Sequence, residues 1–196
     1  MDRQQLKEIR AELKEVLKPD RYEHTLGVEY TAAALAMRYG ADVEKAELAG
    51  LLHDCAKQYS DEEIAMLLME HGIMPTQSEL RSPGILHAIY GPILAQERYG
   101  IDDEEVLSAI RWHTTGKADM SVLEKIVFTA DYIEPSRREI DAREETRGLA
   151  FMDLTYTVFR ITYHVIGYLH KKGMPIEGHT SECYEYLSEN GVYDEQ

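Results

Sequence analysis

The most informative stretch of the chain is AELAGLLHDCAKQYS, residues 46–60. Its apolar residues recur at spacings of three and four, which indicates a helix with a buried face. His53 and Asp54 directly follow two leucines, so we expect the pair to lie inside this apolar helix. Because an ionised carboxylate is costly to bury alone, Asp54 needs a positively charged partner. A metal ion between imidazole and carboxylate meets that need, and this ligand mixture suits Fe, Mn, Co or Zn.

A His-Asp pair by itself is more often structural than part of a metal site. Either both residues lie on a helix surface, or the histidine lies in the core and the aspartate is exposed. Here four further histidine and aspartate residues occur on other apolar segments with helical spacing. They are His24 in RYEHTLGV, His87 in SPGILHAIYG, His113 in AIRWHTTG and Asp131 in IVFTADYIEP. Core packing explains such an ordered set poorly, so the sequence predicts a buried metal site.

Helical periodicity extends over nearly the whole chain, and no alternating strand pattern appears. Capping residues, glycines and prolines divide it into helices expected at about 3–17, 20–39, 42–56, 60–71, 85–99, 103–113, 120–134, 150–172 and 180–189. We expect residues 73–84 to form a loop with room for one short helical turn. The strongly charged segment 136–148 is expected to be a solvated loop or a fraying helix. The pattern predicts one compact all-α domain over residues 1–196.

The composition narrows the possible classes of function. A hydrophobic fraction of 44% and a charged fraction of 29% are typical of a soluble globular chain. No apolar run approaches the roughly 20 residues of a membrane span, and the charged N-terminus is unlike a signal peptide. Two cysteines without CxxC spacing favour the reducing cytoplasm. A net charge of −15 disfavours nucleic acid and membranes as partners, although a metal and a few basic residues can attract phosphate locally.

The ordered histidines and aspartates resemble the HD-domain superfamily of metal-dependent phosphohydrolases. The likeness is strongest to its YqeK-type branch, described as symmetrical bis(5′-nucleosyl)-tetraphosphatases. It rests on RYEHTLGV (21–28), LLHDCAK (51–57), HAIYG (87–91), WHTTG (112–116) and ADYIEPSR (130–137). HD alone is a weak signal, whereas WHTTG followed by ADYIEP is much more specific. The resemblance implies an HD-domain fold with its core at 20–135 and C-terminal helices at 150–190 that complete the pocket.

The resemblance also implies roles for individual residues. It implies a first divalent metal, preferably iron, held by His24, His53, Asp54 and Asp131. His87 and His113 either hold a second metal, with Asp54 bridging, or face the phosphates, and the sequence leaves both open. The expected catalytic residues are Asp54, Lys57, His87 and His113. The expected substrate-binding residues are Arg21, Asp54, Lys57, His87, His113, Thr114, Arg137, His179 and Thr180.

The implied reaction is hydrolysis of a nucleoside polyphosphate by a metal-activated water. The preferred substrate is diadenosine tetraphosphate, cut symmetrically to two ADP, while residue chemistry alone supports only phosphate ester or anhydride hydrolysis. Alternatives are another nucleotidase or deoxynucleotide phosphohydrolase on the same scaffold, and a metal-dependent nucleotide sensor without turnover. A helical interaction module whose six residues are all structural is the weakest alternative. We expect a cytoplasmic monomer or homodimer.

Overall fold

The computed structural model describes residues 3–82, 84–137 and 141–192 of the chain. These residues form helices and no strand, so the predicted all-α fold is confirmed. None of the described helices is long and apolar enough to cross a membrane. The α-helices are α1 (Arg3–Val16), α2 (Pro19–Tyr39), α3 (Val43–Leu52), α4 (Asp61–Glu70), α5 (Gln77–Arg81), α6 (Leu86–Tyr99), α7 (Glu104–Trp112), α8 (Val122–Ile133), α9 (Asp141–Ala150), α10 (Leu154–Lys172) and α11 (Gly178–Glu189), and a 3-10 helix, η1 (Cys55–Gln58), follows α3.

Local capping interactions fix the ends of the helices that surround the centre. Asp42 and Asp103 each accept two backbone N–H groups in the first turns of α3 and α7. Ser121 and Glu124 form a capping box at the start of α8. Gly40 ends α2 with φ 66°, a left-handed conformation that glycine adopts without steric cost. Each of these helices therefore begins or ends at a residue that the sequence specifies locally.

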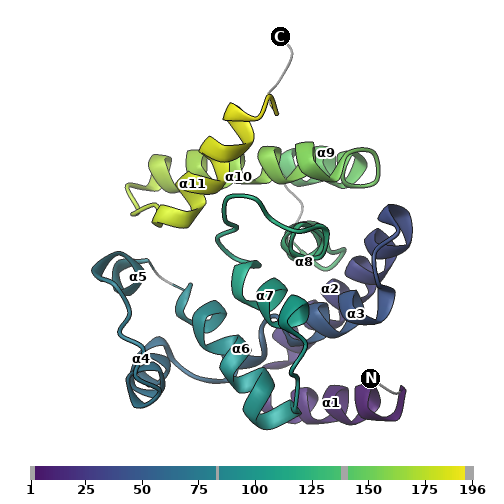
Figure 1. Ribbon diagram of the computed structural model, residues 1–196, viewed down its shortest axis with the longest axis vertical. Coiled ribbons are helices and arrows are strands. Elements are labelled where there is room, and N and C mark those ends of the chain that lie inside the picture. Colours follow the sequence, from purple (N-terminus) through teal and green to yellow (C-terminus); the bar gives the residue numbers. More distant parts are fainter. Residues whose placement is uncertain (1–2, 83, 138–140, 193–196) are drawn as a thin grey trace.

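Helices α2, α3, α7 and α8 pack against one another at the centre of the molecule. Figure 1 shows α9, α10 and α11 together on one side of α8, where they form a layer over the earlier helices. A large apolar core joins α1 to the helices around α8 and reaches Ala150 of α9 and Leu154 of α10. A smaller cluster, which includes Phe128, Phe159 and Cys183, joins α8 to α10 and α11.

The His53-Asp54 pair lies just beyond a helix rather than inside one, so that expectation is wrong. Helix α3 ends at Leu52, and Asp54 has φ −107° and ψ 17° before η1 begins. This is near the bridge region of backbone conformation, which occurs often in active sites. In a continuous helix the two neighbouring side chains would point about 100° apart. The break in the helix lets both of them turn toward one point.

The charged segment after α8 is also more ordered than expected. Helix α9 buries Thr146 and packs on α8 and α10, so from Asp141 onward this segment is a packed helix; residues 138–140 lie outside the described residues. Arg147 donates to the carbonyls of Ile133 at 2.8 Å and Glu134 at 3.0 Å. The Arg147 guanidinium therefore donates to carbonyls at the C-terminal end of α8, where the helix offers no intrahelical donor. Helix α10 begins at Leu154, whereas the sequence predicted a start at about residue 150.

Candidate metal centre

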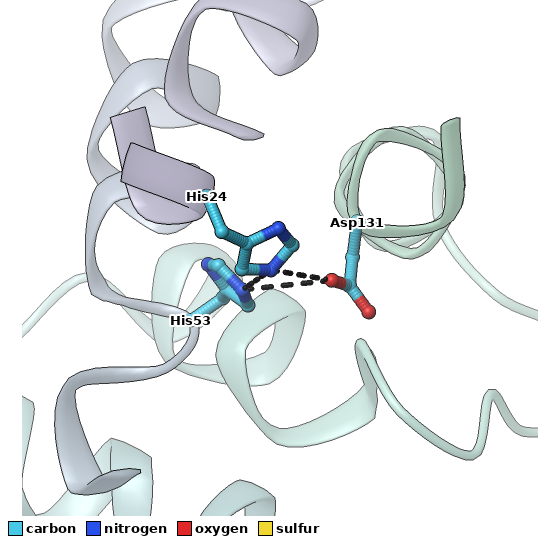
Figure 2. A group of neighbouring side chains, drawn as sticks. All are labelled: His24, His53 and Asp131. Atoms are coloured by element: carbon cyan, nitrogen blue, oxygen red, sulfur yellow. Dashed lines mark hydrogen bonds and ion pairs between the residues drawn. The ribbon is translucent and has the colours of Figure 1, made fainter. Parts of the chain in front are cut away.

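Five segments bring the six predicted ligand residues together. His24 lies in α2, His87 in the first turn of α6 and Asp131 in the last turns of α8. His53 and His113 occupy equivalent places, each directly after the last residue of a helix. Figure 2 shows His24, His53 and Asp131 pointing toward one another from three separate elements. The four histidines of this set are buried, as is Asp54.

The first group of ligand atoms surrounds one point. His24 Nε2 lies 3.0 Å from Asp131 Oδ1 and 3.2 Å from His53 Nε2. Asp54 Oδ2 is 3.3 Å from His53 Nε2 and 3.7 Å from His24 Nε2. Ligand atoms about 2.1 Å from a common ion are separated by roughly 3.0–3.5 Å. His24, His53 and Asp131 therefore have the spacing of a single coordination shell, and Asp54 contacts both of these histidines.

The other carboxylate oxygen of Asp54 faces a second group. Asp54 Oδ1 is 3.1 Å from His87 Nε2 and 3.7 Å from His113 Nε2, and the two imidazole nitrogens are 3.0 Å apart. Thr114 Oγ1 lies 2.9 Å from His113 Nε2 and 3.3 Å from His87 Nε2. Asp54 thus joins the two groups through its two oxygens.

Hydrogen bonds to the outer ring nitrogens orient three of the four imidazoles. His53 Nδ1 donates to Gly50 O and His113 Nδ1 to Ile110 O, both at 2.7 Å. These carbonyls are free to accept because each lies in the last turn of its helix. His24 Nδ1 is 2.8 Å from a carboxylate oxygen of Glu134. Metal-bound histidines almost always have such a partner, which directs the Nε2 lone pair at the ion.

His87 differs from the other three histidines. Its Nδ1 is buried and has no hydrogen-bond partner among the described residues. Burial lowers the pKa of His87 to about 4, despite the opposing effect of Asp54. The imidazole is therefore neutral at pH 7, and its orientation is fixed on one side only.

The carboxylates of the centre are ionised, and its histidines differ in pKa. Burial opposes ionisation of Asp54, but His53 and hydrogen bonds with His113 and His87 hold its pKa well below the usual range. Burial also opposes ionisation of Asp131, and Arg137 and His24 outweigh it. Burial lowers the pKa of His53, whereas at His24 the hydrogen bonds to Asp131 and Glu134 outweigh burial and raise the pKa. Metals bind ionised carboxylates and neutral imidazoles, so a metal would compete with a proton at His24.

Three basic side chains lie beside the ligands. Arg21 donates to Asp54 Oδ2 at 2.7 Å, and Arg137 forms an ion pair with Asp131. Both are partly exposed, so they mark the open side of the centre. Lys57 does not share a helix face with His53, because α3 has already ended. Its Nζ donates to Gly84 O at 3.2 Å, and burial lowers its pKa, although Asp54 opposes that shift.

A cavity of about 150 Å³ lies next to Thr114. Both polar and apolar residues from α10, α11 and three loops line it: Ser82, Ile85, Thr114, Thr115, Val165, Leu169, Met174, Pro175, Glu177 and Thr180. Thr180 is thus brought to the cavity wall. His179 is not a lining residue; its ring packs 4.8 Å from that of Trp112, and its Nδ1 is 2.9 Å from Glu177 Oε1.

Glu134 and the cavity residues Ser82 and Glu177 were not among the predicted site residues. Glu134 stands in the quoted block ADYIEPSR, three residues after Asp131, and its place in that block is the signal that could have found it. Ser82 lies shortly before His87 and Glu177 shortly before His179, but neither carries a spacing signal of its own. Only the packing of α10 and α11 over the earlier helices brings them near Thr114.

The chain is similar to known proteins of one family. The HD domain family matches residues 21–136. The "Bis(5'-nucleosyl)-tetraphosphatase, symmetrical" of Halalkalibacterium halodurans is 44% identical over 169 residues, covering 85% of this chain and 88% of that protein. The protein of the same name from Bacillus subtilis is 39% identical over 175 residues, covering 89% of this chain and 93% of its own length. A solved structure from Clostridium acetobutylicum, described as a predicted HD superfamily hydrolase involved in NAD metabolism, has a TM-score of 0.90 and 41% identity over 94% of this chain and 97% of that one.

This chain therefore belongs to the HD-domain family of metal-dependent phosphohydrolases. Within that family its similarity is to the symmetrical bis(5′-nucleosyl)-tetraphosphatases over most of its length. The resemblance drawn from the sequence blocks, the fold and the hydrolase class are confirmed. Divalent metal binding follows from the family, and the ligand atoms described above suit it.

Proposed function

We propose that this chain hydrolyses diadenosine tetraphosphate symmetrically to two ADP, at a divalent metal held by His24, His53, Asp54 and Asp131. The observation that carries the proposal is the pair of Asp54 oxygens, one at the first ligand group and one at the His87-His113 pair. This arrangement puts groups that can bind phosphate directly beside the proposed metal. The names of the relatives support the choice of substrate.

We propose iron as the preferred metal, with manganese, cobalt and zinc as substitutes that the mixed nitrogen and oxygen ligands also suit. When bound, the metal lowers the pKa of a water molecule and polarises a phosphoryl oxygen. We favour one tightly held ion over two. Among the described residues His87 Nδ1 has no partner for the outer hydrogen bond typical of a metal-bound histidine, so His87 faces the phosphate in this proposal, with His113 and Thr114 beside it.

The basic residues act on the phosphate chain in this proposal. Arg21 and Arg137 each contact a ligand carboxylate from the open side, so a phosphate entering there meets two guanidinium groups. Lys57 donates a hydrogen bond to the backbone carbonyl of Gly84, and the charge of Asp54 favours its ammonium form. Exchanging that carbonyl for a phosphate oxygen stabilises negative charge as the phosphoryl group is attacked.

The cavity next to Thr114 is the proposed site for one nucleobase of the substrate. Its volume of about 150 Å³ is below the range for a drug-sized ligand, so it has room for a base and not for the whole dinucleotide. Thr180 supplies a hydroxyl at its wall. In this proposal the C-terminal helices complete a pocket whose catalytic part lies in residues 20–135. His179 acts only indirectly, through Glu177 and Trp112.

We also infer a cytoplasmic location, because Cys55 and Cys183 are both free, buried thiols. The strongly acidic composition favours a small phosphorylated substrate over nucleic acid.

The proposal is tested by incubating metal-loaded protein with diadenosine tetraphosphate, nucleotides and deoxynucleotides, and resolving the products by chromatography. We expect ADP as the sole product from diadenosine tetraphosphate. ATP plus AMP contradicts symmetrical cleavage, and faster turnover of a mononucleotide indicates a nucleotidase. Tight binding across the panel without any product indicates a sensor.

A further inference from the structure

Glu134 lies on the far side of His24 from the proposed metal. Its side chain is completely buried, and its Oε1 is 2.8 Å from His24 Nδ1. The other ring nitrogen, Nε2, is 3.0 Å from Asp131 Oδ1. The imidazole of His24 is therefore held between two carboxylates, one at each nitrogen.

The backbone around Glu134 directs this carboxylate inward. Glu134 follows the last residue of α8 and precedes Pro135, which disfavours helical conformation at the preceding residue. Its φ of −52° and ψ of 149° turn the chain, and Ser136 then returns two hydrogen bonds to the carboxylate. The Ser136 N–H donates to Oε2 at 2.6 Å and its hydroxyl to Oε1 at 2.8 Å. Burial opposes ionisation, but His24 and Ser136 hold the pKa of Glu134 below its usual value.

Helix α2 leaves space for this carboxylate. Gly27 lies one turn after His24, and a Cβ atom built there would approach Glu134 Oε2 to 2.4 Å. The nearest three atoms to that Cβ all belong to the Glu134 side chain. A larger residue at position 27 would therefore meet the Glu134 side chain first and displace it.

We propose that Glu134 is a positioning residue for the metal, and that Gly27 provides the space it requires. Glu134 accepts the Nδ1 hydrogen of His24, which leaves the Nε2 lone pair directed at the metal and fixes the ring plane. Ser136 holds the carboxylate in place. This inference rests on the proposed role of His24 as a ligand.

The test measures the dissociation constant of Co²⁺ by competition with a chelating dye, in the full-length protein. We expect Glu134→Ala to weaken Co²⁺ binding about 10- to 100-fold, and Glu134→Gln to weaken it less, because the amide oxygen still accepts from Nδ1. Glu124→Gln is the matched control, since Glu124 is a buried glutamate in the first turn of α8 that contacts Ser108, Lys117 and the capping residue Ser121 instead. In the zinc-loaded protein, ¹⁵N NMR is expected to show the His24 proton on Nδ1.

Gly27→Ala separates positioning from general damage to the fold. We expect it to weaken Co²⁺ binding in the wild type but to add no further loss in the Glu134→Ala background. Gly167→Ala, in α10 where a Cβ meets nothing within 4 Å, is the control for a glycine replaced in a helix. Equal losses from Gly27→Ala in both backgrounds would overturn the proposal.

His24→Ala serves as the reference variant. Loss of Co²⁺ binding in His24→Ala, with wild-type binding in both Glu134 variants, overturns the positioning role and leaves the ligand set intact. Retained Co²⁺ binding in His24→Ala overturns the ligand set itself and the inference with it. Thermal melting and circular dichroism of each variant verify that the fold persists.

Discussion

Asp54 contacts both groups of proposed ligands. Its two oxygens face different imidazole pairs, and Arg21 adds a third kind of contact at Oδ2. A carboxylate with this many positive or hydrogen-bonding neighbours stays ionised although it is buried. No other described residue contacts both ligand groups through separate oxygens.

Asp54→Ala is expected to abolish turnover while the fold is retained. The variant removes a metal ligand and the link to His87 together, so we expect kcat to fall on the order of 10³-fold or more. Initial rates with diadenosine tetraphosphate measure the loss, and circular dichroism monitors the fold. Near-normal activity in this variant would remove Asp54 from the centre of the mechanism.

His53→Ala and His87→Ala are expected to behave differently. His53 belongs to the first ligand group and has its outer hydrogen bond to Gly50 O, so its loss should remove the metal. His87→Ala should keep one metal per chain and lose turnover by about 10²-fold or more. Metal content by elemental analysis, paired with rates, distinguishes the two. A fall from two metals to one in His87→Ala would contradict the single-metal proposal.

At the scale of elements, the sequence pattern predicted most of the helices. It did not predict that α3 ends directly before the His53-Asp54 pair. Apolar spacing reveals that α3 exists, but the break at Leu52 has no glycine or proline signal. The hydrogen bond from His53 Nδ1 to Gly50 O occupies a carbonyl near this helix end. Helix α9 was obscured because its arginines satisfy backbone carbonyls of neighbouring segments, an interaction that charge content alone does not reveal.

The ion pair between Arg10 of α1 and Glu29 of α2 leads to a prediction about stability and its dependence on pH. Glu29 is completely buried, and Arg10 Nε lies 3.0 Å from each of its carboxylate oxygens. Arg10→Met leaves this charge unpaired, so we expect a loss of about 3–5 kcal/mol in the free energy of unfolding at pH 7. Arg3→Met is the control, because Arg3 is largely exposed in its pair with Glu47 and should cost under about 1 kcal/mol.

The loss in Arg10→Met should shrink as the pH falls. Burial raises the pKa of Glu29 even with Arg10 present, and removing Arg10 raises it further. A carboxyl with a raised pKa in the folded state takes up a proton there first, so stability is present at low pH and lost as pH rises through the folded pKa. Urea unfolding at pH 5 and pH 7 measures the difference. A constant loss at both pH values would contradict this account.

At the scale of the whole molecule, the centre joins helices that are far apart in the chain. His24, His53 and Asp131 come from α2, the end of α3 and α8, which pack together around the site (Figure 2). The proposed ligands could be picked out from the sequence because they stand in order in apolar segments with helical spacing, and the family resemblance then implied their roles. The cavity was not, because its walls depend on how α10 and α11 lie over Thr114.

A metal that links these elements should stabilise the folded chain as a unit. The unfolded chain lacks the assembled ligands, so binding at a free metal concentration of 100 times Kd adds about 2.7 kcal/mol to the free energy of unfolding. For a domain of this size that corresponds to a rise in Tm of roughly 5–10 °C. Calorimetry of metal-loaded and chelator-treated protein measures the shift, and His53→Ala, which lacks a ligand, should show none. Equal Tm values for loaded and metal-free wild-type protein would mean that the ion does not bridge these helices.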